Sequence, residues 1–238
     1  MTDLVIAPTY NERGNIGTLI ARVLRRYPAM HLLIVDDNSA DGTADAVRAL
    51  QTAYPNIRLL VRPGKLGFSS AYRDAFRLAL AEIPDLRAVI TMDTDLSHDP
   101  DAIESMLAKL DAYDVVVGSR YVAGGGTPDW TLRRRILSRF ANFYARAVTG
   151  TELRDLTTGF VCYRADILRK VDLDALIADG FATLIEMKVR CERLGARIAE
   201  VPIVFADRTH GRSKLSHRIM LEGLVLPWRI SRFRRAKD

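Results

Sequence analysis

The sequence lacks several features that would place it outside the ordinary globular proteins. It has two cysteines, Cys162 and Cys191, whose spacing fits neither a disulfide framework nor a metal site. No apolar run approaches the ~18 residues needed to cross a bilayer. No basic stretch followed by a long apolar one opens the chain, so we expect no signal peptide and a cytoplasmic protein.

Two phosphate-binding motifs are also missing. The chain has no GxxxxGK[ST] sequence and no GxGxxG after its first apolar run. This disfavours a P-loop and the glycine-rich dinucleotide fingerprint. The phosphates of a nucleotide would need other partners, and Arg120, Arg208 and Lys214 are candidates.

The sequence does contain a regular alternation of apolar runs and helix-like segments. Apolar runs of strand length lie at 4–7, 31–35, 57–61, 88–92 and 114–118, and segments of helical period at 15–26, 44–52, 69–81 and 99–110. This order predicts an α/β fold with a mostly parallel sheet flanked by helices. Further helices are expected at 132–148 and 182–194, and a strand at 197–205.

Helix starts are suggested by capping residues. Ser39 or Asp41 offers an N-cap for the helix at 44–52. Pro100 is expected at the first helical position of the segment at 99–110.

Acidic residues follow several predicted strands. Asp93 and Asp95 come after the run at 88–92, and residues i and i+2 of an extended segment point the same way. They could hold Mg²⁺ or Mn²⁺ and so neutralise a leaving diphosphate. The alternative is a solvated acidic turn with Asp99 as a helix cap. Of Asp36 and Asp37, one is expected to bind ribose or base and the other to cap the next helix.

Positive charge gathers at the end of the chain. The last 31 residues hold nine basic and two acidic residues. This asymmetry indicates an anionic partner such as a membrane, a phosphorylated substrate or nucleic acid. We expect a catalytic domain at 1–213 and a basic amphipathic helix at 214–238, interrupted at Pro227. Nucleic acid is disfavoured because the tail has no recognisable stacking motif.

Two apolar stripes have helical period. One comprises Leu132, Ile136, Phe140, Phe143 and Ala147, and the other Leu215, Ile219, Leu226, Ile230 and Phe233. For the first, core packing and membrane contact both stay open. For the second, membrane contact is favoured.

Several ordered motifs carry a specific resemblance. They are PTYNE, VDDNSADGT, MDTDLSHDP, GSRYVAGG, DLTTGF, EVPIVFADR and GRSK. The chain resembles family-2 glycosyltransferases of the GT-A fold, and more narrowly dolichol-phosphate or polyprenol-phosphate mannose synthases, from about residue 4 to residue 220.

This resemblance implies a role for individual residues. It places five in the nucleotide pocket: Pro8, Tyr10, Glu12, Val35 and Asp37. It sets Asp93 and Thr94 against the sugar nucleotide and makes Asp95, with Asp93, a metal ligand. Many relatives carry Gln where this chain has Ser97, so Ser97, water or His98 would complete the metal site.

The resemblance also assigns four basic residues. Arg120 would contact the donor or acceptor phosphate, and Arg134 would face the acceptor phosphate. Arg208 and Lys214 would clamp the donor diphosphate.

The implied reaction is an inverting transfer of mannose from GDP-mannose to a polyprenyl phosphate, dependent on Mg²⁺ or Mn²⁺. The enzyme would be peripheral on the cytoplasmic face of a membrane, and a separate membrane-anchor subunit is a further possible partner. A glucosyl- or N-acetylglucosaminyltransferase using a UDP-sugar is the nearest alternative. A nucleic-acid-binding module and an inactive scaffold are more distant ones.

Overall fold

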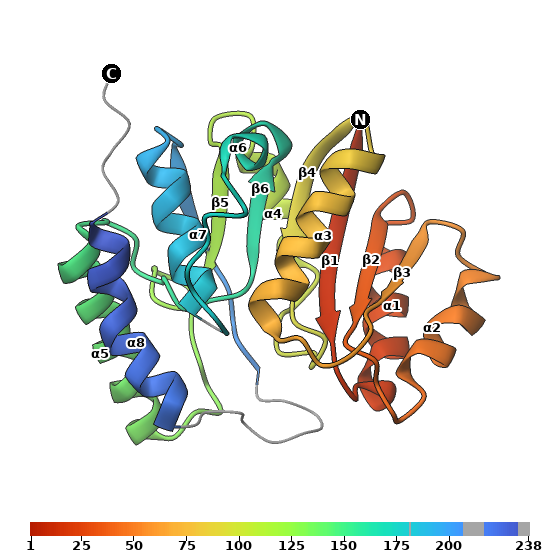
Figure 1. Cartoon of the computed structure of the whole chain (residues 1–238), viewed down its shortest axis with the longest axis horizontal. Coiled ribbons are helices and arrows are strands. Elements are labelled where there is room, and N and C mark those ends of the chain that lie inside the picture. Colours follow the sequence, from red (N-terminus) through yellow and green to blue (C-terminus); the bar gives the residue numbers. More distant parts are fainter. Residues whose placement is uncertain (181, 207–216, 233–238) are drawn as a thin grey trace.

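A twisted sheet with helices on both faces forms the centre of the molecule (Figure 1). The computed structural model describes residues 1–180, 182–206 and 217–232. Its strands are β1 (Thr2–Thr9), β2 (His31–Asp36), β3 (Ile57–Val61), β4 (Leu86–Thr91), β5 (Val115–Ser119), β6 (Val161–Arg164) and β7 (Ile198–Pro202). Its helices are α1 (Arg13–Arg26), α2 (Thr43–Gln51), α3 (Phe68–Glu82), α4 (Ala102–Lys109), α5 (Leu132–Thr149), α6 (Ala165–Lys170), α7 (Ala182–Arg193) and α8 (His217–Ser231).

The seven strands lie in the order β3-β2-β1-β4-β6-β5-β7. Parallel pairs join β1 to β2 and β4, β2 to β3, and β5 to β7, whereas β6 runs antiparallel to both β4 and β5. The prediction of an α/β fold with a mostly parallel sheet is therefore confirmed. β6 and the short α6 were not predicted, because segments of four and six residues carry too little periodicity.

The strands read as unbroken apolar runs because both faces of the sheet are covered. Leu4, Ile6, Leu33 and Val35 pack into the cluster on one face, while Val5, Ala7, Leu32 and Ile34 pack into the cluster on the other. This burial fixes the register of the central strands, since a shift of one residue would exchange the two faces.

Three local predictions were wrong. Gly42, in a left-handed conformation, is the N-cap of α2, and Asp41 instead accepts a hydrogen bond from the Thr43 N–H. α4 begins at Ala102 after an Asp101 N-cap, so Pro100 precedes the helix. Pro227 lies inside α8 and does not interrupt it.

The two apolar stripes differ in exposure where the structure describes their side chains. All five residues of the α5 stripe are exposed, which excludes core packing for that stripe. On α8 the predicted membrane-facing residues Leu226 and Ile230 are buried, in a cluster with side chains of α5 and α7, so that assignment was wrong for these two. Leu215, Phe233 and the side chain of Ile219 lie outside the described part of the chain, and for them the assignment stays a prediction. Periodicity identifies a stripe but not the surface that covers it. The outward side of α8 instead presents Leu224, Val225 and Trp228.

None of the helices in the described part of the chain is long and apolar enough to span a membrane.

Candidate active site at the carboxyl edge of the sheet

Three loops at the carboxyl edge of the sheet contain an unusual backbone conformation. Asn11, Asn38 and Leu96 have φ angles of 57°, 56° and 65°, and they follow the adjacent strands β1, β2 and β4. Within the described ranges no other residue except glycine has a positive φ. Such conformations cost free energy and gather at functional sites. Ligands of open parallel sheets bind at this same edge.

The loops after β1 and β2 are bonded to each other. The Asn11 N–H donates to Ser39 Oγ at 2.8 Å, and the Ala40 N–H donates to Asn11 Oδ1 at 3.2 Å. Ser39 in turn donates its N–H and its hydroxyl to the Asp36 carboxylate, at 2.9 and 2.5 Å. Asp36 therefore holds the loop that follows β2, and it does not cap α2.

Asp37 forms a buried ion pair that the sequence did not indicate. Arg62 Nη1 lies 2.7 Å from Asp37 Oδ1, and the two side chains are only 2% and 8% exposed. The Gly67 N–H donates to the other carboxylate oxygen at 3.1 Å, and Asp74 approaches Arg62 Nε at 3.2 Å. Arg62 thus supplies a cation that offsets repulsion among the acidic residues at this edge.

The predicted nucleotide residues from three strands come together. Pro8 and Val35 are partners in the β1–β2 register. Thr94 Oγ1, after β4, donates to the Pro8 carbonyl at 3.4 Å. Tyr10 lies on the same loop as Pro8, and Lys65 Nζ sits 4.2 Å from its ring centroid. The sequence did not single out Lys65.

Glu12 lies at the start of α1. It is the N-cap residue of that helix, and its N–H donates to Thr43 Oγ1 at 3.0 Å. Its carboxylate accepts a hydrogen bond from Asn15 Nδ2 at 2.8 Å. Glu12 thus links the loop after β1 to the start of α2.

The Asp93 and Asp95 turn directly follows β4, and its neighbours hold it in place. Asp95 is buried, and its Oδ1 accepts hydrogen bonds from Ser97 N at 3.1 Å and Ser97 Oγ at 2.5 Å. The Asp93 N–H donates to His98 Nδ1 at 3.1 Å, and the His98 ring stacks on Phe160. Ser97 and His98 therefore support the turn through these bonds.

The carboxylates fit a divalent metal that keeps open coordination positions. No group of three or more His, Cys, Asp or Glu residues in the described ranges is arranged to hold a metal ion alone. Two hard oxygen donors suit Mg²⁺ or Mn²⁺, which take their remaining ligands from water and substrate phosphates. Asp93 and Asp95 supply such a pair.

Asp93 is bordered by the segment between Asp155 and Phe160. Thr91 Oγ1 donates to the Gly159 carbonyl at 2.7 Å, which brings this segment beside β4. A Cβ atom on Gly159 would lie 3.3 Å from Asp93 Oδ1. Only glycine leaves ordinary space at this contact with the carboxylate.

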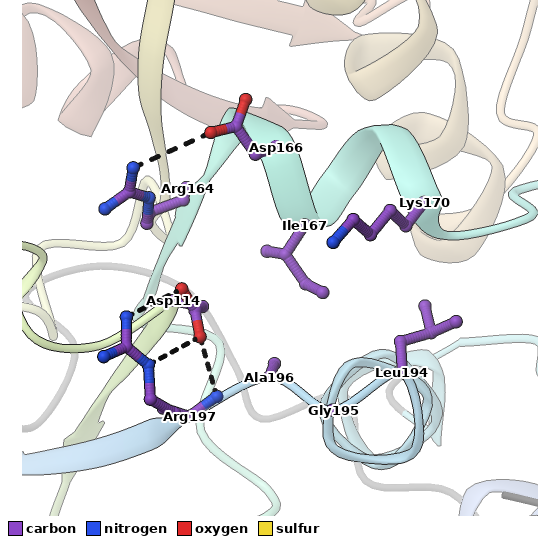
Figure 2. A pocket seen from close by; sticks show the side chains of 9 residues that line it. All are labelled: Asp114, Arg164, Asp166, Ile167, Lys170, Leu194, Gly195, Ala196 and Arg197. Atoms are coloured by element: carbon purple, nitrogen blue, oxygen red, sulfur yellow. Dashed lines mark hydrogen bonds and ion pairs between the residues drawn. The ribbon is translucent and has the colours of Figure 1, made fainter. Parts of the chain in front are cut away.

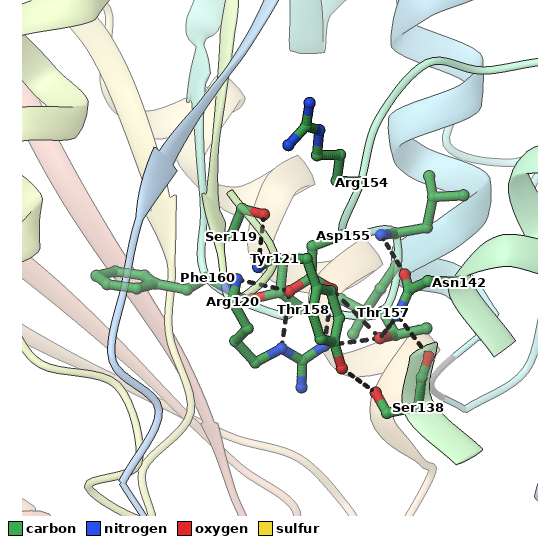
Figure 3. Close-up of polar contacts among 12 residues, drawn as sticks. Ser119, Arg120, Tyr121, Ser138, Asn142, Arg154, Asp155, Thr157, Thr158 and Phe160 are labelled. Carbon is green, nitrogen blue, oxygen red and sulfur yellow. Dashed lines mark hydrogen bonds and ion pairs between the residues drawn. The ribbon is translucent and has the colours of Figure 1, made fainter. Parts of the chain in front are cut away.

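Arg120 forms the most completely bonded ion pair of the site (Figure 3). Its Nε and Nη2 donate to the two oxygens of Asp155 at 2.7 Å each, and its backbone N–H donates at 3.0 Å. Burial raises the pKa of Asp155, but the Arg120 charge and hydrogen bonds outweigh this and lower it overall. Arg120, predicted to contact phosphate, therefore already has a buried counterion.

Trp130 brings Arg120 and Arg134 together. The Cζ atom of Arg120 lies 5.3 Å from the Trp130 ring centroid, and that of Arg134 lies 3.9 Å from it. Arg120, predicted to contact the donor or acceptor phosphate, and Arg134, predicted to face the acceptor phosphate, thus meet on one aromatic side chain just before α5.

Lys188 is a buried residue that the sequence reasoning missed. Its Nζ donates to the carbonyl oxygens of Leu156, Thr158 and Leu184 at 3.0, 2.7 and 3.1 Å. Burial lowers the pKa of Lys188 to about 7. The lysine anchors the segment that carries Asp155 to α7. The sequence signal was slight: a lysine between the apolar residues Met187 and Val189 of that helix.

A pocket lies away from this edge (Figure 2). It has a volume of about 270 Å³ and sits where β5 and β7 begin and β6 ends. Its charges are largely paired, Asp114 with Arg197 and Arg164 with Asp166. The Arg197 hydrogen bond and charge lower the pKa of Asp114. This pocket is at the opposite end of the parallel strands from the Asp93 turn.

Comparison with known proteins agrees with this geometry. The model of glycosyl transferase family 2 matches residues 4–172. The undecaprenyl-phosphate mannosyltransferase of Micrococcus luteus is 38% identical over 225 residues, which cover 94% of this chain and 92% of that protein. The chain belongs to glycosyl transferase family 2. A second relative, the polyprenol monophosphomannose synthase of Mycolicibacterium smegmatis, is 38% identical over 231 residues, which cover 95% of this chain and 86% of that protein.

Solved structures confirm the GT-A-like fold of this family 2 enzyme. Glucosyl-3-phosphoglycerate synthase from Mycobacterium tuberculosis, crystallised with Mn²⁺, UDP and phosphoglyceric acid, has a TM-score of 0.68 at 17% identity, covering 95% of this chain and 76% of that one. The same enzyme with Mn²⁺ and UDP-glucose also gives 0.68, at 18% identity, covering 97% and 78%.

Two predicted residues of the family 2 site, Arg208 and Lys214, lie outside the described residues. Their role as a diphosphate clamp stays a prediction.

Proposed function

We propose that this transferase moves mannose from GDP-mannose to a polyprenyl phosphate and inverts the anomeric configuration. The observation that carries the proposal is the likeness to two proteins named for polyprenyl-phosphate mannosylation, each 38% identical along nearly the whole chain. The arrangement at the carboxyl edge supports it, because the Asp93 and Asp95 turn follows β4 beside the loops after β1 and β2, and Arg120 and Arg134 meet on Trp130.

The donor would lie over the ends of β1, β2 and β4. Pro8, Val35 and Thr94 would line the nucleotide pocket, with Tyr10, Glu12 and Asp37 around it. Asp37 is held in place by its ion pair with Arg62. Its carboxylate would contact the base or ribose from this fixed position. Arg208 and Lys214 would bind the diphosphate.

Asp93 and Asp95 would hold Mg²⁺ or Mn²⁺, with Ser97 positioning Asp95 by its two hydrogen bonds. A bound divalent cation would offset the charge that develops on the departing diphosphate. The role of the protein is to present the two carboxylates rigidly, and the positive φ of Leu96 between Asp95 and Ser97 shows how tightly this turn is shaped.

The acceptor phosphate would need no strong general base. A phosphate monoester has a second pKa near ~6, so it is largely ionised at neutral pH. One of its oxygens would attack the anomeric carbon while the bond from that carbon to the GDP oxygen breaks. Attack from the opposite side inverts the anomeric centre. Arg134, held against Trp130, would face the acceptor phosphate, and the Arg120–Asp155 pair would support that side of the site.

The polyprenyl chain requires a membrane surface, which we place at α5 and α8 on the cytoplasmic face. Exposed apolar side chains cover the outer side of both helices: Leu132, Ile136, Leu137, Phe140 and Phe143 on α5, and Leu224, Val225 and Trp228 on α8. Two hydrogen bonds join the helices. Trp228 Nε1 donates to Tyr144 Oη at 2.9 Å, and the Tyr144 hydroxyl donates to the Leu224 carbonyl oxygen. Amphipathic helices with arginines beside an apolar face lie in the interface of a bilayer. A separate anchor subunit would be the alternative means of attachment.

A UDP-sugar donor is the second candidate. It is favoured by the fold shared with the glucosyl-3-phosphoglycerate synthase, but that likeness has an identity of only 17%. The relatives at 38% identity favour mannose.

Calorimetric titration tests the donor and the metal together. GDP should bind at least tenfold tighter than UDP in the presence of Mn²⁺, and removal of the metal with EDTA should weaken GDP binding. Asp95→Ala should abolish the effect of Mn²⁺ on binding while the circular dichroism spectrum stays unchanged. Tighter binding of UDP would move the assignment to the UDP-sugar class. Equal binding with and without metal would remove Asp95 from the proposed role.

A further inference from the structure

A basic pocket lies beside the exposed face of α5. Its volume is about 330 Å³, and it is lined by Tyr121, Arg139, Asn142, Phe143, Arg146 and Arg154. Three of these six residues are arginines and none is acidic. Three like charges around one pocket repel one another unless an anion or a carboxylate joins them.

No such carboxylate contacts these arginines in the part of the chain that the structure describes. None of the three guanidinium groups forms an ion pair with a described residue, and Arg146 Nε is buried without a described hydrogen-bond partner. The nearby acids are used elsewhere. Asp155 forms an ion pair with Arg120, and the Glu200 carboxylate accepts hydrogen bonds from the backbone N–H groups of Arg154 and Asp155. Figure 3 shows the Arg154 side chain pointing away from the Arg120–Asp155 pair.

The chemistry of the pocket suits a phosphate group. Guanidinium groups bind phosphate oxygens through paired N–H donors and stay charged when partly buried. Tyr121 and Asn142 add polar groups to the wall, although the Tyr121 hydroxyl donates to Ser138 and Asn142 bonds Thr157. The arginines are therefore the main groups left to bind an anion.

The position of the pocket indicates which phosphate. Phe143 lines the pocket and is also 68% exposed on the apolar stripe of α5. Arg139 and Arg146 are seven residues apart, so they project from the same side of the helix two turns apart. A phosphate held there would lie at the edge of the apolar stripe, with its acyl chains able to run along Phe140 and Phe143.

The pocket lies beside the proposed acceptor position and extends beyond it along α5. The Cζ atom of Arg120 lies 5.5 Å from the ring centroid of Tyr121, which lines the pocket. Arg134 lies against Trp130 at the start of α5, whereas Arg146 is twelve residues further along the helix, about 18 Å at 1.5 Å per residue. One phosphate therefore cannot contact both Arg134 and Arg146.

We propose that this pocket binds the phosphate of an anionic membrane phospholipid and thereby fixes how α5 and α8 lie on the bilayer. The inference rests on the membrane association stated under Proposed function and adds a specific headgroup site to it. The pocket arginines at the edge of the stripe would contact the headgroup layer while the apolar stripe enters the acyl boundary.

Vesicle co-sedimentation of the full chain, without donor or acceptor, tests the proposal. One set of vesicles contains phosphatidylcholine alone, and the other contains phosphatidylcholine with phosphatidylglycerol. The variant is Arg139→Gln/Arg146→Gln. The matched control is Arg25→Gln/Arg48→Gln, which removes the same charge from exposed positions on α1 and α2, at the other end of the molecule (Figure 1).

The pocket variant should lose about tenfold in affinity for the phosphatidylglycerol vesicles, and the control should stay within about twofold of the wild type. Thermal unfolding of each variant checks folding, and Arg154→Gln provides a second test from the loop side of the pocket. An equal loss in the control would show that net charge alone acts and would overturn the proposal. So would an unchanged affinity in the pocket variant.

Two further outcomes assign the pocket to another phosphate and also overturn the proposal. One is a higher KM for a short, water-soluble polyprenyl phosphate with vesicle binding intact, which would make the pocket part of the acceptor site. The other is that inorganic phosphate raises the unfolding temperature of the wild type but not of the pocket variant, while phosphatidylglycerol does not change the affinity of either protein for vesicles. If the wild type binds neither kind of vesicle, the membrane association under Proposed function fails as well.

Discussion

Replacing Asp155 by Asn removes the charge of a buried carboxylate with almost no change in volume. In the wild type this carboxylate accepts hydrogen bonds from the backbone N–H, Nε and Nη2 of Arg120, and Asp155 is 0% exposed. Asn offers a single acceptor oxygen and brings an NH₂ group towards the guanidinium. The variant therefore leaves an arginine that is 7% exposed without its counterion.

The expected loss is large for one substitution. Removing one partner of a buried ion pair costs about 3–5 kcal/mol, a substantial part of the ~5–15 kcal/mol that stabilises a typical domain. For a chain of this size, each kcal/mol lowers Tm by roughly 2–4 °C. We therefore expect Asp155→Asn to lower Tm by about 6–20 °C.

The same pair predicts a dependence on pH. The folded-state pKa of Asp155 is lowered, since Arg120 outweighs the opposing effect of burial. Such a carboxyl group contributes stability above its ordinary pKa and loses it as the pH falls through the lowered value. The difference in unfolding free energy between wild type and Asp155→Asn should accordingly be full at neutral pH and shrink in the acid range.

Urea unfolding of the wild type, Asp155→Asn, Arg120→Met and the double variant Arg120→Met/Asp155→Asn measures these effects. The double variant should be clearly more stable than the sum of the single losses predicts, because it leaves no unpaired charge. A loss below about 1 kcal/mol for Asp155→Asn, or strictly additive losses, would refute the reasoning.

Three other substitutions test particular contacts. Gly159→Ala should reduce the rate of sugar transfer at least several-fold with little change in Tm, because the new Cβ would lie 3.3 Å from Asp93 Oδ1. An unchanged rate would show that the Asp93 carboxylate adjusts freely. Gly125→Ala should lower Tm by several degrees, since its Cβ would lie 2.5 Å from the Ser119 carbonyl oxygen, and a wild-type thermal melt would contradict that clash. Burial lowers the pKa of Lys188 from its ordinary 10.5 to about 7. Between these two values the unfolded chain binds more protons than the folded one. The free energy of unfolding should therefore rise with pH in this range, by up to about 1.4 kcal/mol per pH unit. Lys188→Met should remove this rise between pH 7 and pH 9 in urea unfolding, and the same slope in both proteins would speak against it.

The parts of the fold that the sequence predicted are those with a local signal. The strands β1 to β5 were visible because burial on both faces demands unbroken apolar runs. The Asp93 turn was visible because its two acids directly follow such a run. β6 is only four residues long and gave no comparable pattern.

The contacts that the sequence did not predict join distant segments. Arg62 lies 25 residues from Asp37, and Asp155 lies 35 residues from Arg120, so neither pairing leaves a local pattern. Lys188 sits in a helix that was predicted correctly, but only the packing shows that its Nζ reaches backbone carbonyls 30 and 32 residues earlier. Tertiary contacts decided each of these cases.

Product formation tests the central claim most directly. Purified protein would be incubated with Mn²⁺ and a polyprenyl phosphate in vesicles, with GDP-mannose in one reaction and UDP-glucose in another, and the organic phase examined by mass spectrometry. The account predicts polyprenyl-phosphate-mannose from GDP-mannose alone, at a rate that Asp95→Ala abolishes. A polyprenyl-phosphate-glucose product from UDP-glucose, or no glycolipid from either donor, would contradict it.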